Sequence, residues 1–476
     1  MRKRIEGMRG LRVLSTTPGG SFEQERGSAP ARDASDLTGL LLDAEYNLWI
    51  PDAGLSQKKQ RRTLGDAAVD LVLRNARIAD RGATLADVGI ASGLIVAIEA
   101  NIAADAEAVD LGGRLLAPGF IETHIHLDKA CILDRCRAET GDLDEAIAEV
   151  AAAKQRFTVE DVAARASRVI EKCISNGTTH IRTHLEVDPG IGMRGFDGVF
   201  PLIESYRWAV DIEICVFPQE GLLNNPGTDA LMLEALKRGA RVVGAAPYTD
   251  SNPHGQIDRV FEMAREFDVD IDMHLDFGDN ADELDLDYVC QKTDDYCWGG
   301  RVAIGHVTKL SVASSERFDA AARRMAEAGV ALTVLPSTDL FLMHRKDGPT
   351  VRRGVTAAHR LLAHGVNCSL STNNVLNPFT PFGDCSLIRM ANLYANISQI
   401  GARADILECF EMITRRSARI LRLARHEVAV GAPADLVVLD AEAPEAAIGE
   451  IASTLYGFKR GRMTFRRQPV ELLRPH

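Results

Sequence analysis

The stretch Leu115–Ala130, LLAPGFIETHIHLDKA, decides how the rest of the chain is interpreted. A short apolar run ends there in two histidines, His124 and His126, which a single residue separates. In an extended strand, residues i and i+2 point to the same side of the backbone. Two imidazoles on one side can bind one metal ion. The stretch therefore predicts a metal site, provided that the remaining ligands come from elsewhere in the chain.

Beyond this stretch, apolar β segments alternate with helical segments up to about Ile420. Seven further strands are predicted, at residues 179–188, 211–220, 241–248, 270–277, 301–308, 330–338 and 366–374. With the histidine strand they make eight, and helical patterns lie between most of them. This rhythm predicts an α/β protein with a (β/α)8 TIM barrel over residues 118–420. An open doubly wound sheet is the alternative, but no glycine-rich phosphate loop follows the first strand.

The two segments that flank the barrel have a different texture. Residues 66–117 and 421–476 contain short β segments broken by Gly, Asn and Asp, and they predict one small β-sandwich domain built from both segments. Residues 1–65 are rich in Gly, Ser, Pro and charge, and they predict a poorly ordered N-terminal extension. The arginine-rich start of this extension is also compatible with a transit peptide, but a plain extension is favoured.

Composition excludes several classes of protein. The net charge is −12, which argues against nucleic acid as a partner because phosphate binding needs a basic face. The nine cysteines are scattered without a CxxC pair, as is typical of a reduced, cytoplasmic protein. No apolar run approaches the ~18–20 residues that a membrane span needs.

Polar residues gather at the ends of the predicted strands. In a barrel, the carboxyl ends of the strands meet at the face that carries the active site. These ends supply His124 and His126, His184 and Glu186, Gln219 and Glu220, His274 and Asp276, His306, Thr308 and Lys309, and Thr372, Asn373 and Asn374. A single histidine in a strand is usually a packed core residue. Histidines that converge at one barrel mouth instead favour a metal site.

Six ordered segments carry a resemblance to a known family. PGFIETHIHLDKA, RTHLEVD, FPQEGLL, VVGAAPY, IDMHLDF and GHVTKLS resemble the cytosine deaminase branch of the metal-dependent amidohydrolase superfamily. The resemblance runs from about Val69 to the C-terminus. It implies a (β/α)8 barrel, a β-sandwich and one catalytic divalent metal ion, for which zinc is favoured and iron, manganese and cobalt are alternatives. A homo-oligomer is an open alternative, because members of this superfamily often form oligomers.

The resemblance also assigns roles by position. It implies the metal ligands His124, His126, His274 and Asn373. His306 matches a catalytic histidine that touches the metal-bound water or the substrate. Gln219 matches a glutamine that recognises the polar edge of the substrate ring, and Phe379 falls where an aromatic side chain covers the substrate.

Two positions differ from the relatives that deaminate cytosine. Those relatives have Glu three residues after the strand-five histidine and Asp–Asp at the end of strand eight, where this chain has Phe277 and Asn373–Asn374. Deamination needs protons delivered to the ring nitrogen and to the departing ammonia, and neither Phe nor Asn supplies them. A neutral Asn ligand leaves the metal ion more Lewis acidic than Asp would. Water activated by the metal can then attack, with His306 as the remaining titratable partner.

Other candidates have open roles. Lys129 either binds an anionic group of the substrate or is a surface lysine just past the strand. Asp276 is expected on the same side as His274, where it could replace the missing catalytic acid. His184 lies near the substrate, contributes to a second metal site, or is a packed histidine. Phe277 is expected to face the substrate.

The sequence therefore favours a metal-dependent hydrolase. It would cleave a non-peptide C–N bond in a small polar substrate such as an N-heterocycle, a triazine, a urea or a carbamate. The first alternative is an aminohydrolase, which deaminates a cytosine-like or triazine ring and in which Asp276 or His306 moves the protons. The second alternative is a non-catalytic homologue that binds metal. Retention of the histidines together with Gln219 argues against this last interpretation.

Overall fold

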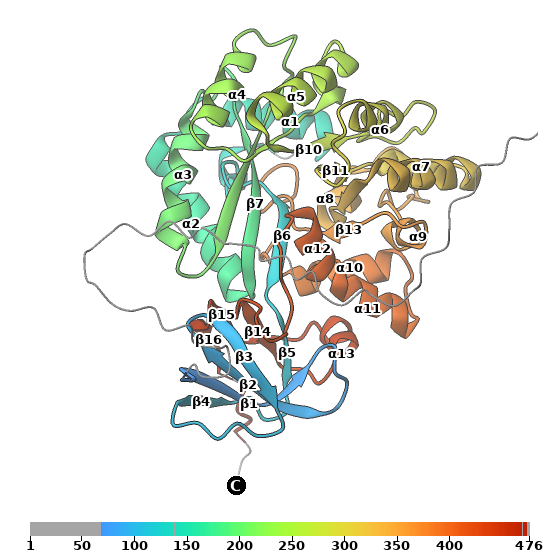
Figure 1. Ribbon diagram of the computed structural model, residues 1–476. Helices are drawn as coiled ribbons and strands as arrows, with labels where there is room; N and C mark the ends of the chain where they lie inside the picture. The colour runs from blue at the N-terminus through green and yellow to red at the C-terminus, as the bar shows by residue number, and fades with distance from the viewer. Residues whose placement is uncertain (1–67, 138, 469, 474–476) are drawn as a thin grey trace, which may run out of the picture. The chain divides into compact units, whose positions relative to one another are not determined.

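Figure 1 shows the computed structural model of the chain, which describes residues 68–137, 139–468 and 470–473. The extension predicted over residues 1–65 lies outside the described residues. The described chain contains a parallel barrel and an additional β-sheet domain, which confirms the predicted fold class. Among the described helices, none is both long and apolar enough to cross a membrane.

Eight parallel strands form the barrel, in the sequential order β6 to β13. Their bounds are β6 Phe120–Ile125, β7 Thr178–Glu186, β8 Asp211–Phe217, β9 Val242–Val243, β10 Asp270–Leu275, β11 Val302–His306, β12 Val330–Val334 and β13 Cys368–Leu370. Strands β6 and β7 are buried along their whole length, as expected for a parallel sheet that is covered on both faces. The predicted strand over residues 241–248 is reduced to β9, and a 3-10 turn, Pro247–Thr249, follows shortly after it.

The sheet closes through the histidine stretch itself. The backbone N–H of His126 donates to the carbonyl of Asn373 at 3.0 Å, and the N–H of Asn373 donates to the carbonyl of His124 at 2.9 Å. The first strand and the end of the last strand therefore lie side by side. Residues that are about 250 positions apart in sequence meet here because a barrel joins its first strand to its last.

Helices follow most of the barrel strands. Their bounds are α1 Leu143–Lys154, α2 Val159–Ser175, α3 Arg194–Tyr206, α4 Thr228–Lys237, α5 Pro253–Phe267, α6 Leu286–Asp295, α7 Ser315–Ala328, α8 Pro336–Leu342, α9 Ala358–Ala363, α10 Leu387–Ile397, α11 Arg403–Glu411 and α12 Arg415–Ile420. Side-chain caps start several of them: Asp142, Thr158, Asn252, Ser314 and Ser386 each accept a hydrogen bond from a backbone N–H in the first turn.

The β domain combines both ends of the described chain, below the barrel in Figure 1. Its strands are β1 Leu71–Ile78, β2 Leu85–Ala91, β3 Leu94–Glu99, β4 Glu107–Asp110, β5 Leu115–Pro118, β14 Leu436–Leu439, β15 Thr454–Lys459 and β16 Arg462–Arg466, and a short helix, α13 Pro444–Gly449, follows β14. Strand β5 pairs antiparallel with β14, so one hydrogen-bonded sheet contains both chain segments. Strand β5 leads directly into β6, which places the histidine strand at the junction with the barrel.

A buried lysine joins the β domain to the barrel. Lys459, at the end of β15, donates to Oδ2 of Asp435 at 2.8 Å and to the carbonyl of Thr179 in β7 at 3.0 Å. Its Nζ is also 2.8 Å from a carboxylate oxygen of Asp211 in β8. His180 and the two carboxylates have the spacing of a metal site, but the ammonium of Lys459 occupies the space among them.

Candidate active site

Three imidazole rings converge at the carboxyl end of the barrel. His124 lies in β6, His126 follows that strand, and His274 lies in β10. Nε2 of His274 is 3.0 Å from Nε2 of His124 and 3.1 Å from Nε2 of His126. Burial lowers the pKa of all three imidazoles well below the usual range, so each ring is neutral at neutral pH. A neutral imidazole keeps a lone pair on one nitrogen, which is what a metal ligand requires.

Asn373 adds an oxygen to this set from the end of the sheet. Its φ is 65°, a left-handed conformation that is uncommon for a residue other than glycine. Its Oδ1 atom is buried and has no hydrogen-bond partner within the described chain. Three imidazole nitrogens and one carbonyl oxygen are ligand types that zinc and other divalent ions accept. The residues present therefore fit one divalent ion.

His306 reaches the same point from the end of β11. Its Nε2 is 3.4 Å from Nδ2 of Asn373, and its Nδ1 is 2.6 Å from Oδ1 of Asp339 in α8. Nδ1 is therefore the donor to the carboxylate, and Nε2 faces the cavity side. Burial raises the pKa of Asp339, while the contact with His306 opposes that rise. Asp339 thus orients the ring of His306.

Glu122 organises the strand end that carries Asn373. This buried residue lies in β6, two positions before His124. Its Oε1 accepts the backbone N–H of Thr372 at 2.9 Å, and its carboxylate also accepts the hydroxyls of Ser371 and Thr372. These bonds hold the segment after β13 against β6. The carboxylate therefore fixes the position of Asn373 without facing the cavity.

A second layer lies beneath the histidines. Asp272, in β10, has its Oδ1 atom 3.4 Å from Nε2 of His184 and 3.8 Å from Nδ1 of His124. Its Oδ2 atom accepts from Arg182 at 2.9 Å. Burial alone would raise the pKa of Asp272, but the imidazoles and Arg182 lower it well below its usual range. His184 stacks on His124, with ring centroids 3.7 Å apart, and it is absent from the cavity wall.

Lys129 is buried, so its alternative as a surface lysine is wrong. Its Nζ donates to Glu186 at 2.7 Å and to Oε1 of Gln219 at 3.0 Å, and it lies 4.5 Å from the ring centroid of Phe379. The surface position was one of two open alternatives, because the residue follows the end of a strand. In the folded chain, the acidic end of β7 and the Phe379 loop enclose it instead.

These groups surround a small cavity. Its wall consists of His126, Lys129, Leu143, Gln219, Tyr248, His274, Phe277, His306, Thr338, Leu342, Asn373, Asn374 and Phe379. The structure thus brings most of the predicted site residues to one place. His124 meets the other metal ligands just beneath this wall.

Asp276 does not reach the cavity. Strand β10 ends at Leu275, and Asp276 takes a left-handed φ of 47°, so the expected alternation of side chains stops. Its two carboxylate oxygens accept the backbone N–H groups of Asp285 and Leu286, at 2.9 and 3.0 Å. The expectation that Asp276 lies on the same side as His274 is therefore wrong. The residue instead caps the start of α6.

Sequence reasoning missed three carboxylates of this site. Glu122 and Asp272 each lie two residues before a metal-ligand candidate in the same strand, so the period of two was an available signal. Asp339 had no such signal. It lies 33 residues from His306 and meets it only because α8 packs over the barrel end.

Comparison with known proteins agrees with this geometry. The sequence profile of the amidohydrolase family matches residues 107–199 and 151–465. N-isopropylammelide isopropyl amidohydrolase of Pseudomonas sp. (strain ADP) is 28% identical over 404 residues, which are 83% of this chain and 96% of that protein. Pterin deaminase of Rhizobium rhizogenes is 26% identical over 366 residues, which are 76% and 83% of the two chains.

A solved structure extends the likeness to three dimensions. The 5-methylcytosine deaminase of Klebsiella pneumoniae, bound to 5-fluorocytosine, has a TM-score of 0.81 and 28% identity. The match covers 85% of this chain and 99% of that one. The family profile spans the histidine strand and the barrel, and the histidines converge as a hydrolytic site requires. This chain therefore belongs to the amidohydrolase family and is a hydrolase of carbon–nitrogen bonds other than peptide bonds.

Proposed function

We propose that the chain is a mononuclear metal-dependent hydrolase that cleaves an exocyclic C–N bond of a small, oxo-substituted N-heterocycle. The observation that carries this proposal is the convergence of three imidazole Nε2 atoms at the floor of a small cavity that Asn373 also lines. Zinc is the favoured ion. A cytoplasmic location and a homo-oligomer stay predictions from the sequence.

His124, His126, His274 and Asn373 would hold the ion. When bound, such an ion would supply Lewis-acid activation of water. His306 stands beside this point, and within the described chain its Nε2 has the amide of Asn373 as its only hydrogen-bond contact. It takes a proton from the attacking water and returns it to the leaving nitrogen. Asp339 holds the ring for both transfers.

The cavity wall is rich in hydrogen-bond donors. Gln219 uses Oε1 to accept from Lys129, which leaves its Nε2 without a partner in the described chain. Asn374 uses Oδ1 to accept from Asn377, which leaves its amide NH₂ group for a ligand. A ring with carbonyl or anionic oxygens complements these donors and Lys129. A ring whose edge carries only amino groups would leave them unpaired, at a cost of about 1–3 kcal/mol each.

The side chains of the wall support the same substrate class. Phe277 and Phe379 supply flat apolar surfaces, against which a single planar ring can pack. No Asp or Glu lines the described cavity, so protonation of the leaving group depends on His306. An amine is therefore as suitable a leaving group as ammonia. The similarity to an amidohydrolase of N-isopropylammelide supports this assignment.

The aminohydrolase remains the second candidate function. The likeness to pterin deaminase and to 5-methylcytosine deaminase favours it. In this version, His306 alone would shuttle protons to the ring and to the departing ammonia, because Asp276 caps α6 outside the cavity. Separate measurement of ammonia and amine release from the same substrates distinguishes the two activities.

The metal assignment is tested first. Elemental analysis of purified wild-type protein should show about one divalent ion per chain, and His124→Ala should lose both the ion and the activity. His254→Ala is the matched control, because His254 is exposed in α5 and lies outside the cavity. Full metal content in His124→Ala would contradict the assignment of His124 as a metal ligand.

The substrate class is tested with metal-loaded enzyme. A panel of single-ring heterocycles should contain pairs that differ only in oxo against amino substitution, and each should carry an ammonia or an alkylamine leaving group. The donor-rich wall predicts a higher kcat/KM for the oxo-substituted members. Equal rates for both members of every pair would contradict the predicted role of Lys129 and Gln219.

A further inference from the structure

A metal-binding imidazole needs its second nitrogen held in a defined state. A neutral ring has one N–H, so a ring that ligates through Nε2 must carry the proton on Nδ1. For His126, Nδ1 lies 3.1 Å from the backbone carbonyl of His184, which accepts that proton. For His274, Nδ1 has no partner in the described chain. For His124, Nδ1 also has no hydrogen-bond partner in the described chain, and the carboxylate oxygen that faces it is Oδ1 of Asp272, at 3.8 Å.

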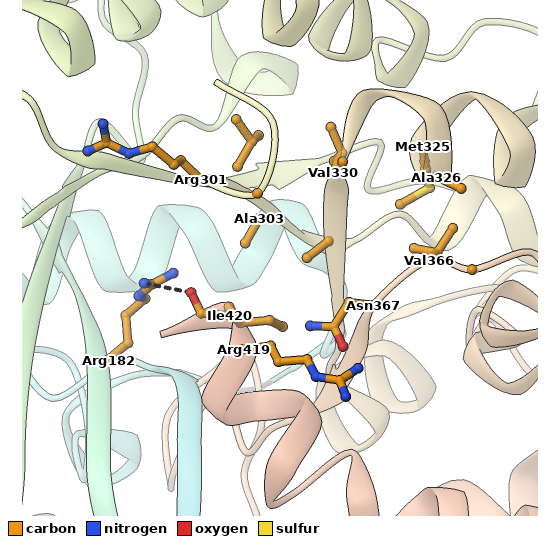
Figure 2. A pocket seen from close by; sticks show the side chains of 15 residues that line it. Arg182, Arg301, Ala303, Met325, Ala326, Val330, Val366, Asn367, Arg419 and Ile420 are labelled. Carbon is orange, nitrogen blue, oxygen red and sulfur yellow. Dashed lines mark hydrogen bonds between the residues drawn. The ribbon is translucent and has the colours of Figure 1, made fainter. Parts of the chain in front are cut away.

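Arg182 fixes the carboxylate that faces His124. This fully buried side chain extends from β7 across the base of the barrel. Its Nε donates to Glu213 at 2.6 Å, one terminal nitrogen donates to Oδ2 of Asp272 at 2.9 Å, and the other lies 3.4 Å from the carbonyl of Ile420. Figure 2 shows the contact with Ile420 at the edge of a cavity at the amino-terminal ends of the strands. Because Arg182 binds Oδ2 of Asp272, Oδ1 of the same carboxylate faces the imidazoles of His124 and His184.

We propose that Asp272, held by Arg182, is a positioning residue that keeps the proton of His124 on Nδ1 and so directs its Nε2 lone pair at the metal site. The inference rests on the proposed metal-dependent function. In the opposite tautomer, the N–H of Nε2 would point at Nε2 of His274, only 3.0 Å away, and His124 could not ligate. The carboxylate acts through His124 and touches neither the substrate nor the metal.

The geometry predicts an unusual effect for Asp272→Asn. Arg182 offers only donors, so the amide would turn its oxygen toward Arg182 and its NH₂ group toward Nδ1 of His124. A donor at this place favours the wrong tautomer of His124. The substitution preserves the side-chain volume. It therefore removes the acceptor that faces Nδ1 of His124 with little change in packing.

The test measures the dissociation constant of Zn²⁺ by competition with a chromophoric chelator, together with thermal unfolding of the metal-free protein. Asp272→Asn should bind Zn²⁺ about 10–100-fold more weakly than wild type. Arg182→Met/Asp272→Asn should recover part of this loss, because the amide is then free to turn its oxygen toward His124. A merely structural role predicts the reverse, since the double variant loses more native contacts.

His184→Phe is the matched control, because it keeps a flat ring against His124 but removes the other imidazole near Asp272. It should bind Zn²⁺ as wild type does. An equal loss in His184→Phe, or unchanged affinity in Asp272→Asn, overturns the inference while wild type still binds one ion. Should Asp272→Asn fail to fold, Arg182→Met carries the test: weaker binding supports the inference and unchanged binding overturns it. Wild-type protein without stoichiometric metal would overturn the proposed function itself.

Discussion

His306 combines backbone strain with a directed side chain. Its φ of 71° is left-handed, and such conformations of residues other than glycine concentrate at functional sites. His306→Asn would keep a polar group beside Asn373 but could not exchange a proton. We expect turnover to fall by roughly 10²–10⁴-fold, the scale of general acid–base catalysis, with metal content intact.

Steady-state kinetics with parallel metal analysis checks this expectation, and His254→Ala again serves as control. Asp339→Asn should lower turnover less, because the imidazole remains but loses its orientation. If His306→Asn keeps near-normal turnover, His306 has a structural role. Proton transfer would then need a solvent route, since Asp276 does not line the cavity.

Phe277 decides what chemistry the cavity lacks. Its ring lines the cavity with its centroid 4.5 Å from that of His306, so the chain has no titratable group at this position of the wall. Wild-type protein should therefore release ammonia from cytosine slowly or not at all. Phe277→Glu/Asn373→Asp should gain measurable activity, with a lower unfolding temperature because the new Glu is buried. Rapid deamination of cytosine by wild type would refute the argument.

At the scale of elements, the end of β7 is held by a buried charge network. Glu186 accepts from Lys129 at 2.7 Å and from Lys154 of α1 at 3.0 Å, and Lys154 also pairs with Asp188 at 2.5 Å and with Glu220. Burial would raise the pKa of Glu186, but the two lysines lower it to about 2. The network thus joins α1 to β7 and holds Lys129 in the cavity wall.

Glu186→Gln should lower the free energy of unfolding by roughly 3–5 kcal/mol, because two buried lysines lose a charged partner. Since the folded-state pKa of Glu186 is depressed, its contribution is complete above the ordinary value of about 4.3 and disappears as the pH falls toward 2. Denaturant titrations of metal-free wild type and variant should therefore converge with falling pH. A constant difference between pH 6 and pH 3 would contradict this linkage.

At the scale of the whole described molecule, Lys459 couples the β domain to the barrel. Lys459→Met would leave Asp435 buried without its ammonium partner, and we expect a loss of roughly 3–5 kcal/mol in the free energy of unfolding. Lys459→Met/Asp435→Asn should recover part of that loss. Lys292→Met is the control, because its partner Asp258 is exposed and such pairs contribute about 0–1 kcal/mol. Equal losses in both single variants would refute the coupling.

The sequence by itself determined the framework of the site. Side chains in a strand alternate with a period of two, which depends only on neighbouring residues. The sequence therefore predicted that His124 and His126 point to the same side of the strand. The succession of strands and helices predicted the barrel, and a barrel brings strand ends together whatever its loops do. His274, His306, Gln219 and Asn373 could therefore be placed at one mouth before any coordinates.

Only the tertiary structure decided the partners of these side chains. The contact of Asp339 with His306, the contact of Asp272 with Arg182 and the enclosure of Lys129 depend on register between strands and on helices that pack over the barrel end. Neither follows from local periodicity. Asp276 shows the same limit, because one left-handed residue after β10 turned it out of the expected face. Residues that are far apart in sequence form hydrogen bonds only where closure of the barrel brings them together in space. The sequence thus determined which residue types can bind the metal. Their side-chain orientation and protonation depend on contacts that only the folded chain forms.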